Sequence, residues 1–220
     1  MEITIQRSKI IGAIAALFGL LGIFGFLEYA PAMRDADNKY LGESFRIFFI
    51  HVPSAWTSFV LFFGSFISGI TYLARRKPFW DRLSASFTEV GMVYATIVIV
   101  TGPIWARAAW GTFWNWEPRL TSFMVLWIIY FGYLLLRHSI DETQLRAKSC
   151  AVMSVIAFVN VPIVFFAIRM WGTKSHPTPG PGYFQEPSIR NAIIFNFVAL
   201  LVIAFHLVTK KMLTEKTNEV

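Results

Sequence analysis

Long apolar stretches separated by short polar segments recur along the whole chain. Crossing a bilayer takes about 20 mostly apolar residues, and six stretches are long enough to do so. A helix satisfies its own backbone hydrogen bonds in lipid, so the pattern predicts an all-α polytopic membrane protein, a bundle of six transmembrane helices in a single domain over residues 1–220. The predicted helices cover residues 10–27, 47–73, 87–105, 120–136, 151–168 and 192–208.

Composition supports this fold class. The chain is 55% hydrophobic and only 15% charged, with a mean hydropathy of +0.54, whereas a soluble domain usually carries about 25% charged residues. A β-barrel would show alternating segments of about 10 residues, which the sequence does not contain. The first apolar stretch lacks a small-residue cleavage site, so we expect a retained first helix and not a removed signal peptide.

The positive charges predict the orientation. Placing the N-terminus inside assigns twelve of the 20 Lys and Arg to the inner side, including the clusters ARRKPFWDR and TKK. An excess of Lys and Arg on cytoplasmic loops is typical of membrane proteins. We therefore expect both termini inside (N-in/C-in). The formal charge of +7 is then explained by topology and the lipid bilayer, and it does not indicate nucleic acid.

This orientation brings three segments to the outer side: residues 31–46, 105–121 and 172–190. The second reads WARAAWGTFWNWEPRLT and holds four of the eight tryptophans. Tryptophan favours the membrane interface, but an interfacial belt does not need this density. Indole faces can stack on a porphyrin, so we interpret the segment as a loop that holds a haem. The residues assigned to this platform are Trp110, Gly111, Trp114, Trp116 and Glu117.

Two of the four histidines belong to the same outer side. His51 lies near the outer end of the second helix and His176 lies in the last outer segment. Histidine is a usual ligand of haem iron, and two from different helices can bind one iron from opposite faces. For either residue alone, a polar contact at the interface is the alternative. On the inner side, His138 is interpreted as a headgroup contact and His206 as a packing residue.

Arginines near the predicted site have a matching role. A guanidinium makes paired hydrogen bonds to a carboxylate, and haem carries two propionates. Arg119 closes the tryptophan segment and Arg46 precedes His51 by five residues; interfacial anchoring is the alternative for each. The single cysteine, Cys150, and the absence of a C-x-x-C-H motif predict non-covalent haem binding. Asn160 and Pro162 predict a kink in the fifth helix.

Three blocks resemble the cytochrome c maturation protein C (CcmC) family, part of a haem-handling superfamily with a tryptophan-rich WWD segment. They are FRIFFIHVPSAW, VTGPIWARAAWGTFWNWEPRLTS and NVPIVFFAIRMWGTKSHP. The resemblance implies a bacterial inner-membrane protein with haem b at the periplasmic face, His51 and His176 as axial iron ligands, and Arg46 and Arg119 at the propionates. Glu117 departs from the family pattern, which has aspartate there.

The resemblance also implies a role and partners. Such proteins are not enzymes; they deliver haem to a periplasmic chaperone, CcmE, beside an ABC-type complex of CcmA and CcmB and the small membrane protein CcmD. Three alternatives stay open from the sequence. They are a b-type electron-transfer subunit, a permease subunit without a cofactor, and a cytochrome c synthase of the same superfamily, although synthases are generally larger.

Overall fold

The protein is described here from a computed structural model, which covers residues 10, 12–14, 16–19, 21–22, 42–171 and 186–218. Every regular element in this part of the chain is helical. A short 3-10 helix, η2 (Glu43–Ile47), leads into α2 (Phe48–Arg75) and α3 (Pro78–Trp110). The remaining helices are α4 (Pro118–Ser139), α5 (Thr143–Phe158), α6 (Asn160–Trp171) and α8 (Pro187–Asn218).

Five helical spans are long and apolar enough to cross a membrane, which indicates a multi-pass membrane protein. They correspond to the second through sixth predicted stretches, since α5 and α6 together form one span, Thr143–Ala167. The first predicted stretch, residues 10–27, lies largely outside the described residues. Those of its positions that are described, such as residues 12–14 and 16–19, are helical.

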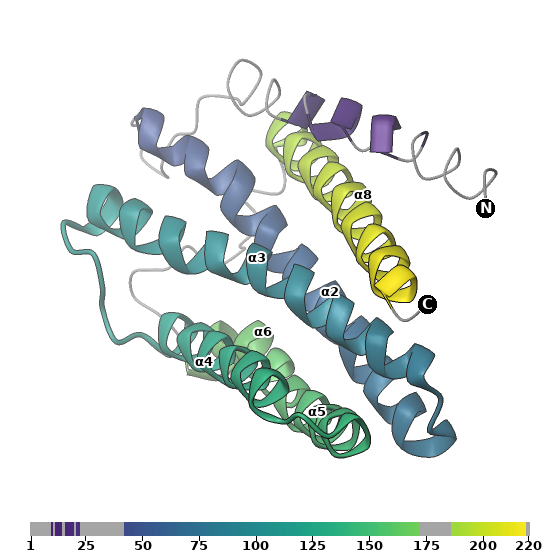
Figure 1. The fold of residues 1–220 in the computed structure, drawn as a ribbon. Helices are drawn as coiled ribbons and strands as arrows, with labels where there is room; N and C mark the ends of the chain where they lie inside the picture. Colours follow the sequence, from purple (N-terminus) through teal and green to yellow (C-terminus); the bar gives the residue numbers. More distant parts are fainter. Residues whose placement is uncertain are drawn as a thin grey trace.

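Helices α2 and α3 form the centre of the bundle. Helix α8 packs on one side of this pair, and α4, α5 and α6 pack on the other (Figure 1). Figure 1 also shows that α2, α4 and α8 begin at the end of the bundle where α3 and α6 finish. The start of α2, the end of α3 and the start of α4 therefore share one end of the molecule.

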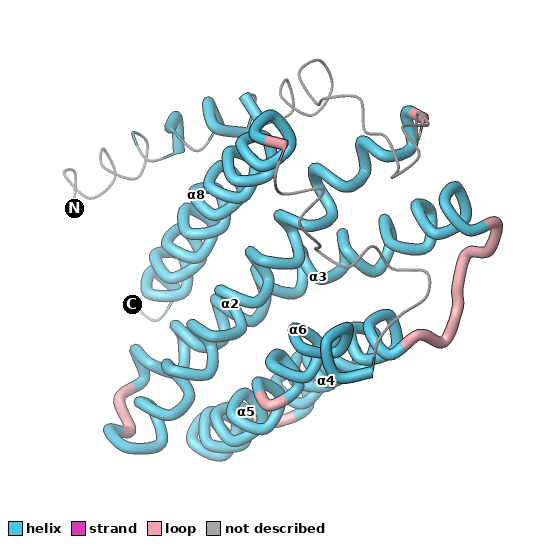
Figure 2. Tube along the Cα trace, turned by 180° about the vertical axis from the view of Figure 1, so that it is seen from behind, coloured by secondary structure: helices cyan, strands magenta, loops and turns pink. Residues whose placement is uncertain are grey.

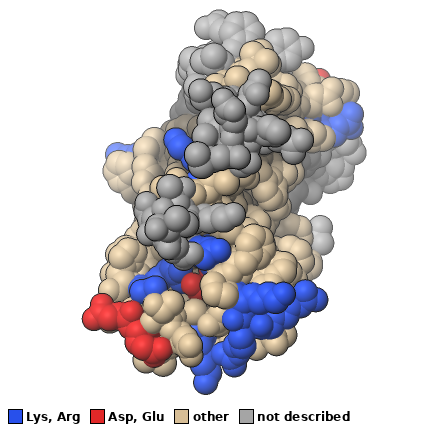
Figure 3. All heavy atoms as spheres, turned by 45° about the vertical axis from the view of Figure 1, so that its right-hand side comes forward, with Lys and Arg blue, Asp and Glu red and all other residues tan. Residues whose placement is uncertain are grey.

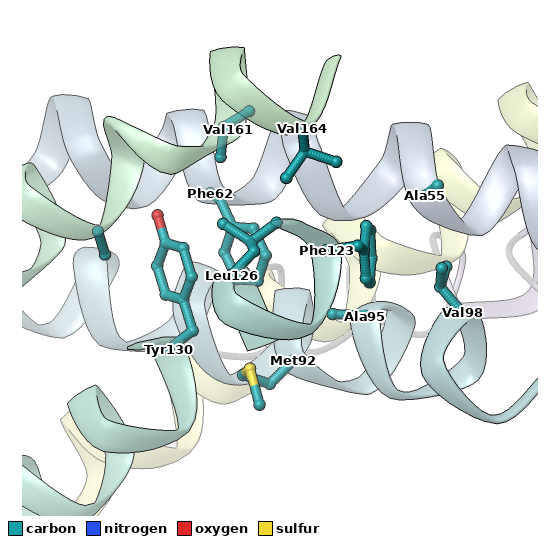
Figure 4. Close-up of a cluster of buried hydrophobic side chains, with 11 residues drawn as sticks. Ala55, Phe62, Met92, Ala95, Val98, Phe123, Leu126, Tyr130, Val161 and Val164 are labelled. Atoms are coloured by element: carbon teal, nitrogen blue, oxygen red, sulfur yellow. The ribbon is translucent and has the colours of Figure 1, made fainter. Parts of the chain in front are cut away.

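The main core cluster joins the central helices α2 and α3 to α4, α5 and α6 (Figure 4). Phe62 of α2 stacks on Tyr130 of α4 with ring centroids 3.6 Å apart and planes 8° apart. Leu126 is fully buried beside them. Small residues permit close approach elsewhere: a Cβ added at Gly69 of α2 would lie 3.1 Å from the carbonyl oxygen of Ala151 in α5. Such close backbone contacts are typical of helices packed in membranes.

A proline inside a helix leaves one backbone carbonyl without its usual hydrogen-bond donor, and a neighbouring helix can supply that donor. Pro53 lies inside α2 and has no N–H, so the carbonyl of Phe49 lacks its usual partner four residues on. The side-chain amide of Asn196 in α8 donates to that carbonyl at 3.0 Å. In lipid an unsatisfied carbonyl is costly, so this bond holds α8 against the start of α2.

The helix is interrupted near Asn160 and Pro162, where the sequence predicts a kink. The helical hydrogen bonding is interrupted at Val159, which separates α5 from α6. Pro162 cannot donate to Phe158, and the side chain of Asn160 donates to the carbonyl of Ser122 in α4 at 3.0 Å. This hydrogen bond connects the break between α5 and α6 to the first turns of α4.

Charged residues gather at the end of the bundle opposite the tryptophan segment. Arg75, Arg76 and Lys77 at the α2–α3 turn are exposed. Figure 3 shows Lys and Arg concentrated at the lower end of the molecule in that view. Asp81, at the start of α3, is buried and accepts two hydrogen bonds from Arg137 of α4, at 2.9 and 3.0 Å. Glu89 of α3 pairs with Lys211 of α8, so an ion pair also joins these two helices.

Candidate functional site

The tryptophan segment is not a loop over its whole predicted length. Helix α3 continues to Trp110, and α4 already begins at Pro118, so only residues 111–117 lie outside the helices. Figure 2 shows this stretch as a long loop between the end of α3 and the start of α4. The helix continues past the charged Arg107 because an arginine near a membrane surface can extend its head group into water.

Gly111 ends α3 because it can adopt a left-handed backbone conformation. Its φ is +76°, and its N–H donates to the carbonyl of Arg107 at 3.1 Å. The side chain of Arg107 in turn donates to the Gly111 carbonyl and lies over the Phe113 ring, 5.6 Å from its centroid. These contacts define where the loop leaves the helix.

Trp114 and Trp116 form an edge-to-face pair in this loop, with ring centroids 5.9 Å apart and planes at 78°. The two rings differ in exposure: Trp116 is 74% exposed, whereas Trp114 is half-buried. The indole Nε1 of Trp114 is buried and has no hydrogen-bond partner among the described residues. A buried donor of this kind is costly unless something accepts its hydrogen bond.

Glu117 and Arg119 lie where the loop enters α4. Glu117 is the N-terminal capping position of the helix, and its carbonyl accepts a hydrogen bond from the N–H of Thr121 at 3.0 Å. Arg119 follows in the first turn and is half-buried. The side chain of Trp110 belongs to the part of the chain that the structure does not describe, although its backbone closes α3.

His51 lies in the first turns of α2, and its ring contacts α3. Its Nδ1 is 2.9 Å from the hydroxyl oxygen of Thr101 in α3. The positive charge of Arg119 in α4 acts on the same ring. His51 and Arg119, which are 68 positions apart in the sequence, therefore lie within electrostatic range of each other at the end of the bundle that carries the tryptophan loop.

Arg46 precedes His51 in η2, in a segment packed against the end of α3. The neighbouring Phe45 ring meets Trp105 edge-to-face, with centroids 6.0 Å apart and planes at 83°. Phe45 and Phe49 are buried against Ile189 and Ile193 of α8. This cluster fixes the approach of η2 to α2 and places Arg46 at the same end of the bundle.

The other histidines have separate positions. His176, the second predicted iron ligand, lies outside the described residues. His138, at the end of α4, is exposed and its Nδ1 is 2.7 Å from the carbonyl of Leu134. The ring of His206 lies against Gly12: a Cβ added there would be 3.2 Å from His206 Cε1. This contact supports the predicted packing role of His206.

A separate apolar groove of about 440 Å³ runs between α2, α6 and α8. Its walls include Trp56, Phe165 and Phe197, and none of the predicted haem residues whose side chains are described lines it. Two contacts at the His51 ring, from Thr101 and Gly102, were not predicted from the sequence. Both residues lie in the VTGPIW block, but a sequence pattern does not show which neighbouring side chain they face.

Comparison with known proteins places the chain in a family. The family model described as Heme exporter protein C matches residues 1–220. The chain belongs to the Heme exporter protein C family. This agrees with the resemblance to CcmC that the three sequence blocks carry.

Curated members of the family are similar over most of this chain. Heme exporter protein C of Bradyrhizobium diazoefficiens is 30% identical over 170 residues, which cover 77% of this chain and 64% of that protein. The Escherichia coli K12 protein of the same name is 28% identical over 190 residues, or 86% of this chain and 75% of that protein. The Paracoccus denitrificans protein is 28% identical over 182 residues, or 83% and 72%. The matched region thus spans between 64% and 75% of the length of these three relatives.

Proposed function

We propose that the protein binds haem b non-covalently at the outer face of a bacterial inner membrane and delivers it to the periplasmic chaperone CcmE for cytochrome c maturation. The haem is cargo, and the protein acts as a carrier and not as an enzyme. Membership of the Heme exporter protein C family supports haem handling. The observation that supports the site is the His51 ring, whose Nδ1 is 2.9 Å from the Thr101 hydroxyl oxygen and which lies within electrostatic range of Arg119, at the end of the bundle that carries the tryptophan loop.

Residues at this end of the bundle have the chemistry that haem needs. His51 offers an imidazole nitrogen to iron, and we assign His176 as the second axial ligand. Arg119 and Arg46 are suited to the two propionates. The buried Trp114 Nε1 donor also fits a carboxylate oxygen of the cargo. The other aromatic ring of the loop, Trp116, is exposed and can cover the porphyrin face.

Delivery requires that a partner can reach the haem. We propose six membrane spans with both termini inside, which puts the tryptophan loop in the periplasm. The loop residues Phe113 and Trp116 are 60% and 74% exposed, so an edge of a haem held there would be accessible from the outer aqueous phase. We further propose that the chain works beside CcmA, CcmB and CcmD, with CcmA and CcmB supplying the ATP-driven step.

Transfer can be tested with the purified protein and a tagged CcmE. We expect the protein to purify with haem, and its visible spectrum to decline as haem appears on CcmE after mixing and separation. Haem that cycles between oxidation states but stays on the protein would instead indicate a b-type electron-transfer subunit. A colourless preparation from haem-replete cells would contradict haem binding itself.

A further inference from the structure

The hydroxyl proton of Thr101 is used in a hydrogen bond within α3 and is not available to His51. Its Oγ1 donates to the carbonyl oxygen of Ile97, four residues earlier in α3, at 2.6 Å. A hydroxyl has one proton and two lone pairs, so Oγ1 can only accept from its second neighbour. That neighbour is Nδ1 of His51, at 2.9 Å. The hydrogen bond between them therefore runs from the imidazole N–H to the threonine oxygen.

This direction fixes the tautomer of His51. With the proton on Nδ1, a neutral imidazole carries its free lone pair on Nε2, and Nε2 becomes the atom available to a metal. A histidine that ligates a metal generally donates its other ring N–H to an oxygen, which orients the ring and makes the ligand more basic. Thr101 supplies that oxygen from a different helix.

Gly102 holds the same ring from the next position of α3. A Cβ at residue 102 would lie 3.3 Å from Cε1 of His51, the carbon between the two ring nitrogens. Such a contact is tight, so a side chain at this position would crowd the ring. Consecutive residues of α3 thus set the proton position and leave space for the imidazole.

We infer that Thr101 is a positioning residue for the haem site: it accepts the Nδ1 proton of His51 and so presents Nε2 to the iron, while Gly102 leaves room for the ring. The inference rests on the proposed haem-binding function and adds residues from α3 to it. It makes the register between α2 and α3 part of the site, because the ligand on one helix is oriented by the other.

Thr96 provides a matched control within the same helix. Its Oγ1 donates to the carbonyl of Met92, four residues earlier, at 2.7 Å, and accepts from the indole Nε1 of Trp127 in α4 at 3.0 Å. Thr96 and Thr101 therefore make the same pair of hydrogen bonds, one within α3 and one from an aromatic N–H on a neighbouring helix. Only the bond at Thr101 involves His51.

The experiment compares Thr101→Val, Thr101→Ser and Thr96→Val in the full-length protein, using haem titration and the haem midpoint potential. We expect Thr101→Val to weaken haem binding about tenfold, the lower end of the effect of such outer contacts. Its midpoint potential should rise, because a less basic imidazole stabilises ferric iron less. Thr101→Ser keeps the hydroxyl and should restore both values, and Thr96→Val should match the wild type.

Several results would overturn the inference. One is a Thr101→Val protein with wild-type affinity and potential; another is a Thr101→Ser protein as impaired as Thr101→Val, which would implicate the methyl group. An equal loss in Thr96→Val would show a general packing effect. Failure of the proposed function looks different: the wild type would bind no haem, or His51→Ala would retain it, whatever the threonine variants do.

Discussion

Replacing His51 with alanine is expected to strip haem from the purified protein, with a loss of affinity greater than about 100-fold. Loss of a contact to a ligand already costs about 10- to 100-fold in metal affinity, and here the ligand itself is removed. The His51 ring contacts Thr101 and lies close to Gly102 of α3, and alanine at position 51 offers no nitrogen to iron. The measurement is haem content per protein, followed by haem titration.

His138→Ala is the control for this variant. His138 is an exposed histidine at the far end of α4, and its Nδ1 is hydrogen-bonded to the Leu134 carbonyl of its own helix, so haem content should be unchanged. Adding imidazole to His51→Ala should partly restore binding, since the small ligand can fill the space of the lost ring. Full haem content in His51→Ala without imidazole would remove His51 from the site.

Breaking the ion pair between Asp81 and Arg137 should have the largest effect on stability. Both side chains are largely buried, with 9% and 14% exposed, and they form two hydrogen bonds. Removing one partner leaves a buried charge uncompensated, which costs about 3–5 kcal/mol. Asp81→Leu and Arg137→Met should each lower the free energy of unfolding in detergent by this amount, measured by chemical denaturation.

Two comparisons sharpen that prediction. The double variant Asp81→Leu/Arg137→Met should recover much of the loss, because no unpaired charge remains. Lys211→Met breaks the ion pair between Lys211 and Glu89, whose side chains are 33% and 29% exposed, respectively. This variant should lower the free energy of unfolding by only about 0–1 kcal/mol. A loss in Asp81→Leu no greater than that in Lys211→Met would contradict a stabilising role for the buried pair.

The apolar pattern was sufficient to predict an all-helical fold and the approximate positions of the five spans found in the described residues, but not where the helices end. The prediction ended the third helix at residue 105, whereas α3 continues to Trp110. Hydropathy falls at Arg107, but the helix ends only where Gly111 adopts a positive φ. Helix α4 begins at Pro118, because proline fits the first turn of a helix, where a backbone N–H has no partner within the helix.

The site residues stay predictions, although some of their placement agrees with the sequence. The predicted topology puts His51 and Arg119 on one side, and in the structure they lie at one end of the bundle within electrostatic range. The contacts of Thr101 and Gly102 could not be predicted, because they depend on how α2 and α3 are rotated and shifted against each other. A shift of one residue along either helix would present a different side chain to His51. The role of His176 stays a prediction, since it lies outside the described residues.

The electron paramagnetic resonance spectrum of the ferric protein, with haem supplied in excess, tests the account most directly. It should show a six-coordinate low-spin haem in the wild type, as expected for two imidazole ligands on one iron. The His51→Ala and His176→Ala proteins should each lose this signal. A low-spin signal that persists unchanged in either variant would contradict the assignment of these two histidines to one haem.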